Sequence, residues 1–82
     1  MAILDSSSGV LAPGVCQLGL ERANSGDWRA WCEFEPGQFR HFEFMSGTQA
    51  PAWLAYVLRI QHGFEAAKAK LASDWLFEAV GN

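Results

Sequence analysis

Apolar and polar residues alternate along three successive segments of the chain. These segments are VCQLGLER at 15–22, WRAWCEFE at 28–35 and QFRHFEFM at 38–45. A period of two is typical of a β-strand that buries one face. Turn-forming residues separate the segments, with ANSGD in the first gap and Pro36 and Gly37 in the second. The pattern therefore predicts a three-stranded antiparallel meander.

The length of the second connection decides which residues share a face of the sheet. A two-residue loop would place Phe42 and Phe44 on the side of Trp31, among charged residues. A three-residue loop over 36–38 would instead place Phe42 opposite Cys32. We expect the three-residue loop, because it creates one apolar face. That face consists of Cys16, Leu18, Leu20, Trp28, Ala30, Cys32, Phe34, Phe42 and Phe44.

The segment from Gln49 to His62 fits two structures. As a helix it has Pro51 near the first turn, where the missing N–H is harmless, and it forms an apolar stripe. The stripe would contain Leu54, Val57, Leu58 and Gln61. As a strand it also alternates, and its Trp, Tyr, Val and Ile content suits a sheet. The composition favours the strand, which would be the fourth of the sheet.

The two ends of the chain differ in character. Residues 1–14 are rich in Ser and Gly and predict a flexible N-terminal arm, so that a single α+β domain covers 15–82. The helix-forming residues of 64–80 predict a C-terminal helix, and Phe77 is expected to be exposed on it. Its core-facing stripe would contain Phe64, Ala67, Leu71 and Trp75. The predicted fold class is α+β, an antiparallel three- or four-stranded meander with a C-terminal helix packed on one face.

Composition narrows the classes of function. A chain of 82 residues, half of them hydrophobic, is one small folded domain rather than a disordered one. Its net charge of −3 has the wrong sign for holding phosphates, so direct nucleic-acid binding is not expected. Cys16 and Cys32 lack CxxC spacing and are expected to be reduced core thiols. Neither a signal peptide nor a membrane span is predicted, and we expect a cytoplasmic protein.

The sheet face opposite the apolar face carries the candidate site. It has a centre of aromatic residues and Met45 with carboxylates around it, among them Glu21. Exposed apolar patches with polar rims mark interaction sites. In the expected register, Glu33 lies opposite His41 as a solvated pair. The residues predicted to bind a partner are Arg29, Trp31, Glu33, Glu35, Phe39, His41 and Glu43.

The order of motifs also suggests a family resemblance. The order is a turn, SGDWRA, a short hairpin, a Trp-containing strand and a helix opening GFEAAKAKLASDW, and the likeness covers about residues 17–80. This arrangement resembles the small four-strand-plus-helix accessory proteins of proteobacterial phages and prophages, some of which are anti-CRISPR proteins. Here the third strand is more aromatic, and SGTQAPAW replaces the glycine-rich turn of those proteins. The resemblance implies a protein that binds and blocks a host defence complex.

We therefore expect a small non-enzymatic binding or inhibitor protein, encoded by a phage or prophage, that acts in the bacterial host. Its partner would be a nucleic-acid-handling complex of the CRISPR-Cas type with a basic surface. The alternative is a structural or regulatory homodimer that buries Trp31, Phe39 and Met45 against a second copy. No catalytic residues, cofactor or metal are expected, because two histidines do not supply a nucleophile, a base and an orienting group, or enough ligands.

Overall fold

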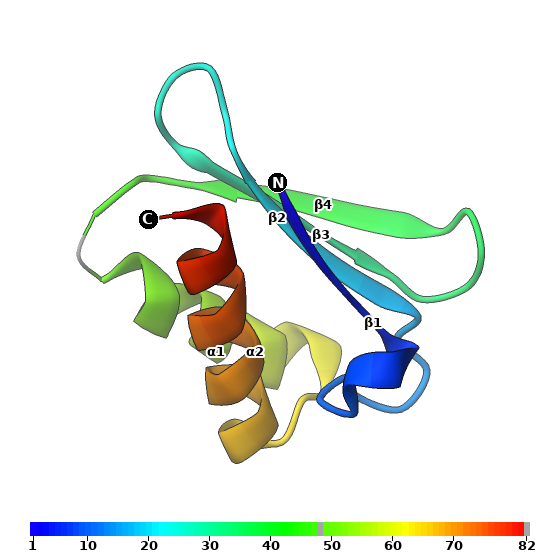
Figure 1. Ribbon diagram of the computed structural model, residues 1–82. Helices are drawn as coiled ribbons and strands as arrows, with labels where there is room; N and C mark the ends of the chain where they lie inside the picture. The colour runs from blue at the N-terminus through cyan, green and yellow to red at the C-terminus, as the bar shows by residue number, and fades with distance from the viewer. Residues whose placement is uncertain (48, 82) are drawn as a thin grey trace.

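The protein has two layers, a sheet and a pair of helices (Figure 1). The computed structural model describes residues 1–47 and 49–81. Thr48, within the SGTQAPAW segment, and Asn82, the end of the expected domain, lie outside the described residues. The antiparallel sheet has the order β1-β2-β3-β4, formed by Ala2–Asp5, Gln17–Arg22, Trp28–Glu33 and Phe39–Phe44. A short 3-10 helix, η1 (Ser6–Ser8), follows β1, and the helices are α1 (Ala50–His62) and α2 (Ala66–Val80).

The predicted α+β class is confirmed, with a C-terminal helix on one face of an antiparallel four-stranded sheet. Both helices lie on the same side of the sheet, which leaves the other side without a helical layer (Figure 1). We call this second side the outer face.

The fourth strand does not come from the segment that the sequence favoured. It is β1, which pairs with β2 so that Ala2 lies opposite Leu20 and Asp5 lies opposite Gln17. Ala2 and Leu4 are buried in the core. The expected start of the folded unit at residue 15 is therefore wrong, because the fold begins at Ala2. The pattern of AILD is too short to stand out from the Ser- and Gly-rich residues that follow it.

The hairpin between β3 and β4 has the predicted three-residue loop, but one position earlier. The N–H of Phe34 donates to the carbonyl of Gln38 at 3.0 Å, which leaves residues 35–37 in the turn. Each β4 residue therefore pairs two positions away from its expected partner, and Phe42 lies opposite Ala30. A shift of two preserves the faces. The predicted apolar face is confirmed for this reason, although its pairing is not.

Residues 50–62 form a helix, so the favoured strand is wrong. A helix brings Leu54, Val57 and Leu58 to one buried face, whereas a strand would have divided Leu54 and Val57 between two faces. Gly63 ends the helix with a φ of 74°, in the left-handed region that favours glycine. Packing in the core thus overrides the strand preference of the individual residues.

The C-terminal helix packs with a different face from the predicted one. Leu71 and Trp75 are 60% and 48% exposed, whereas Phe77 is 1% exposed. The buried residues of α2 are Ala69, Ala72, Ser73, Leu76 and Phe77. Both stripes have helical spacing, but the buried one has small residues that let α2 approach α1 closely. The Ser73 hydroxyl donates to the carbonyl of Pro51 at 2.6 Å and joins the two helices.

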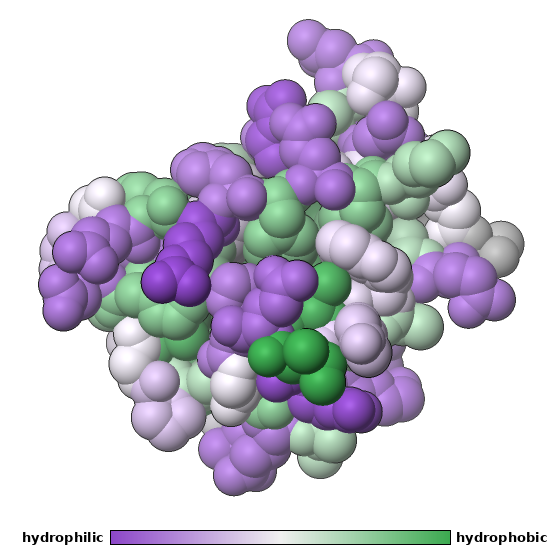
Figure 2. All heavy atoms as spheres, turned by 180° about the vertical axis from the view of Figure 1, so that it is seen from behind, coloured by the Kyte–Doolittle hydropathy of each residue, from purple (hydrophilic) through white to green (hydrophobic). Residues whose placement is uncertain are grey.

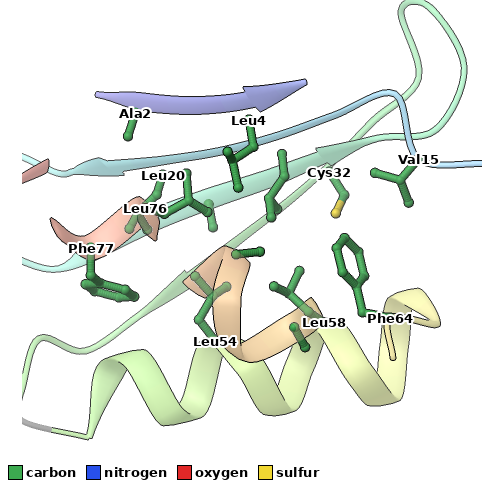
Figure 3. Close-up of a cluster of buried hydrophobic side chains, with 14 of the residues drawn as sticks. Ala2, Leu4, Val15, Leu20, Cys32, Leu54, Leu58, Phe64, Leu76 and Phe77 are labelled. Atoms are coloured by element: carbon green, nitrogen blue, oxygen red, sulfur yellow. The ribbon is translucent and has the colours of Figure 1, made fainter. Parts of the chain in front are cut away.

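The core lies between the sheet and the helices. Figure 3 shows Ala2, Leu4, Leu20 and Cys32 reaching from the sheet toward Leu54, Leu58, Leu76 and Phe77 on the helices. Phe77 meets Trp28 edge to face, with ring centroids 4.6 Å apart. Figure 2 shows the molecule from the side opposite to that of Figure 1. Apolar side chains also reach the surface on this side, but polar side chains lie between them.

The two cysteines are both free thiols. Cys32 is buried, and burial raises the pKa of its thiol to about 12 despite the opposing charge of Arg40. Cys16 is half-buried, and its Sγ lies 3.0 Å from the carbonyl oxygen of Phe34. A thiol with a raised pKa is a poor nucleophile. Cys32 therefore contributes to the core rather than to chemistry.

His62 lies at the edge of the core between aromatic rings. Its ring centroid is 5.7 Å from that of Phe42 and 5.5 Å from that of Phe34. Neither ring nitrogen has a hydrogen-bond partner among the residues that the structure describes. Burial, and then the charge of Arg40, lower the pKa of His62 below its ordinary value. The folded protein therefore favours the neutral imidazole.

This environment predicts a loss of stability in mild acid. The unfolded chain takes up a proton on His62 more readily than the folded one, so the free energy of unfolding falls as the pH drops below about 6.5. The variant H62L is expected to weaken this dependence. Urea unfolding at a series of pH values measures the effect. An identical slope in H62L and the wild type would assign the titration to another group.

Candidate protein-binding surface

The pairing of the four strands arranges the outer face in three rows. The middle row runs across all four strands through Ile3, Gly19, Trp31 and His41. One flanking row contains Glu21, Arg29 and Glu43. The other contains Asp5, Gln17, Glu33 and Phe39. Aromatic and charged side chains therefore lie side by side on a surface without a helix over it.

Trp31 lies at the centre of this face and packs on a glycine of the neighbouring strand. It is only 9% exposed, although no helix covers it. Its ring lies over Gly19 on the neighbouring strand, where a Cβ atom would overlap the ring. An aromatic residue laid over a strand glycine covers backbone that the missing side chain leaves open. Trp31 thus reaches burial within the monomer, without a second layer or a second copy.

Arg29 links two carboxylates across three strands. Its Nε lies 3.1 Å from Oε1 of Glu43, and its Nη1 lies 3.7 Å from Oε1 of Glu21. All three side chains are partly exposed, so the pairs contribute little to stability. The three rows contain four carboxylates and one guanidinium, so these groups have a formal net charge of −3. The carboxylates are those of Asp5, Glu21, Glu33 and Glu43.

A shallow hollow of about 580 Å³ lies over β2, β3 and β4. It contains five of the seven predicted binding residues, Arg29, Trp31, Phe39, His41 and Glu43, together with Gln17 and Glu21. Phe39 is 44% exposed, and its ring centroid lies 5.9 Å from that of His41. The hollow thus combines an aromatic floor with charged walls.

Glu33 and Glu35 do not line the hollow. Glu33 lies in the row of Phe39, and its Oε2 accepts a hydrogen bond from the N–H of Gly37 at 3.1 Å. The expected pair of Glu33 with His41 is wrong, since the shifted register places Trp31 opposite His41. Glu35 belongs to the hairpin turn. Glu33 therefore lies at one end of the hollow, between Gln17 and Phe39, and Glu35 lies beyond the strands.

Several residues of the face were not recognised as site residues in the sequence. Ile3 and Asp5 belong to β1, which the sequence did not predict. Gln17 continues the alternation of β2, so its place on the outer face could have been predicted from the two-residue period alone. The importance of Gly19 could not be recognised, because a glycine in a strand gives no sign of the ring that covers it.

Within residues 1–47 and 49–81, no three His, Cys, Asp or Glu residues gather closely enough to hold a metal ion. No helix in the same part of the chain combines the length and apolar character that a bilayer crossing requires. In comparisons with known proteins, no family model, curated protein or solved structure matches the chain. The function therefore has to be inferred from the residues of the surface.

Proposed function

We propose that this protein binds a partner protein with a basic surface through its outer face, and that it acts by binding rather than by catalysis. The observation that carries the proposal is the hollow around Trp31, an aromatic floor bordered by carboxylates on a face that no helix covers. Interfaces are enriched in aromatic residues and Arg at their centres, with polar groups around them.

The net charge of the outer face indicates the class of partner. Three net negative charges repel phosphate and attract a surface rich in Lys and Arg. Proteins that handle nucleic acid carry such surfaces. The most specific form of the proposal is an inhibitor of a host defence complex of the CRISPR-Cas type, working in the bacterial cytoplasm. It is the function that the resemblance to phage and prophage proteins implies.

The arrangement of the side chains favours tight binding for a small face. The Trp31 ring packs on Gly19, and the guanidinium of Arg29 is paired with Glu21 and Glu43. Groups that are already ordered lose less conformational entropy when a partner binds. The outer face therefore presents its main contact groups in fixed positions.

The test is a charge reversal with a matched control. E33K/E43K reverses two carboxylates of the outer face, and the lysine that it introduces at position 43 also repels Arg29. Q61K/E65K/A67K makes the same change in net charge on exposed residues of the helical layer. Wild type and both variants serve as baits in a proteobacterial lysate, and the captured protein is then purified and titrated against each.

The proposal expects one basic partner that wild type and Q61K/E65K/A67K retain. E33K/E43K is expected to bind it about tenfold more weakly or not at all, with an affinity that falls at high salt. Equal binding by E33K/E43K, or a loss confined to Q61K/E65K/A67K, would contradict the outer-face proposal. A monomer–dimer equilibrium in sedimentation that E33K/E43K abolishes would favour the homodimer instead.

A further inference from the structure

The sheet has a free edge at β1. In the part of the chain that the structure describes, this strand pairs with β2 alone, and in Figure 1 it runs along the near edge of the sheet with α2 below it. Edge strands present unpaired N–H and C=O groups that can pair with another chain, and charged residues usually protect them. The opposite edge, β4, carries Arg40, His41 and Glu43, whereas β1 has only Asp5.

A groove of about 620 Å³ lies beside this edge, between β1, the residues after it and α2. Its apolar wall is formed by Ile3, Leu4, Val10, Leu71 and Trp75. Leu71 and Trp75 are the large α2 residues that the core does not use, and both remain about half exposed. The groove is thus an apolar surface that runs beside the unpaired edge of β1.

Carboxylates surround the groove. Asp5, Asp74 and Glu78 all line it. Asp5 accepts hydrogen bonds from the N–H and the hydroxyl of Ser7, which lower the pKa of its carboxyl and keep it ionised. Asp74 is paired with Lys70 at 2.6 Å, one turn away on α2. The charge around the groove therefore favours a basic occupant over an acidic one.

We propose that the groove beside β1 binds an extended peptide segment of alternating apolar and basic residues, which adds to the sheet as a fifth strand. Backbone groups of the segment would pair with β1, since strand addition of this type supplies affinity through main-chain hydrogen bonds. Because side chains alternate along a strand, its apolar residues would contact Leu71 and Trp75 while its basic residues lie beside Asp5. The site is separate from the hollow around Trp31, and either proposal can fail alone.

The probe is the acetylated and amidated hexapeptide KVKVKV, with EVEVEV as its acidic counterpart. Each is titrated into ¹⁵N-labelled protein. KVKVKV is expected to shift the amide signals of Ile3, Leu4 and Asp5 and the indole signal of Trp75. It is also expected to slow hydrogen exchange at β1, which charge attraction alone would not do. EVEVEV is expected to bind at least about tenfold more weakly.

Variants separate the contributions to binding. W75A and D74K/E78K are each expected to weaken KVKVKV binding about five- to tenfold. Y56A, at an exposed aromatic position on α1, and E33K/E43K, on the outer face, keep the wild-type affinity. The proposal is overturned if KVKVKV does not bind, if EVEVEV binds equally, or if the shifts fall on β3 and β4. A dimer in sedimentation that W75A dissociates would also overturn it, because a second copy would then occupy the groove.

Discussion

Phe77→Ala is expected to lower the free energy of unfolding by about 3–5 kcal/mol, the usual cost of removing a buried aromatic ring. Phe77 is fully enclosed and packs edge to face on Trp28, with a further contact to Phe44. Its loss leaves a cavity where the sheet and α2 meet. Since a domain of this size has only a few kcal/mol of stability, F77A is expected to be largely unfolded at room temperature.

The control is Trp75→Ala, two positions earlier on the same helix. Trp75 is larger than Phe77 but 48% exposed, so its loss is expected to cost less than about 1 kcal/mol. Urea unfolding followed by circular dichroism gives both values. Where F77A does not fold, F77L replaces it, with a smaller cavity and a smaller cost. A greater loss of stability in W75A than in F77L would mean that α2 packs with its predicted face and not with the one seen here.

Gly19→Ala is expected to lower the free energy of unfolding by about 1–3 kcal/mol, as overpacking does. The new methyl group would occupy the place of the Trp31 ring, which has to leave the surface of β2. The matched control is Gly47→Ala, because a Cβ atom at position 47 meets no atom of the described residues within 4 Å. That variant is expected to stay within about 0.5 kcal/mol of the wild type.

A double-mutant cycle with Trp31→Ala assigns the effect to the contact between the two residues. If the ring is the obstacle, G19A costs less in the W31A background than in the wild type, by about 0.5–3 kcal/mol. Equal costs in the two backgrounds would mean that Gly19 is required for another reason. Since Trp31 forms the floor of the hollow, G19A is also expected to weaken partner binding.

The features that the sequence predicted best are those that depend on the two-residue period of a β-strand. The residues of β2, β3 and β4 face the sides that parity assigned to them, which explains why five of the seven predicted binding residues meet in one hollow. Parity does not determine the pairing itself. A loop that starts at Glu35 rather than Pro36 moved Glu33 away from His41 while leaving both on the same face.

Other features depend on contacts between distant parts of the chain. On α2, Phe77 is buried together with the small residues Ala69, Ala72 and Ser73, and the Ser73 hydroxyl donates to the carbonyl of Pro51 on α1. Helical spacing alone does not distinguish this face from that of Trp75. The residues of α1 have a local preference for a strand. They form a helix because a helix brings their large apolar side chains to one buried face. The position of β1 depends on pairing with β2, which its four residues alone do not reveal.

The contact between β1 and α2 joins opposite ends of the chain. Ala2 and Leu4 belong to the same buried cluster as Leu76 and Phe77, so the first strand has no apolar cover until the last helix is in place. On a ribosome, the N-terminal strand emerges long before the residues that shield it. The core around β1 is therefore complete only when α2 has docked, and until then the apolar side chains of β1 remain open to any other chain in reach.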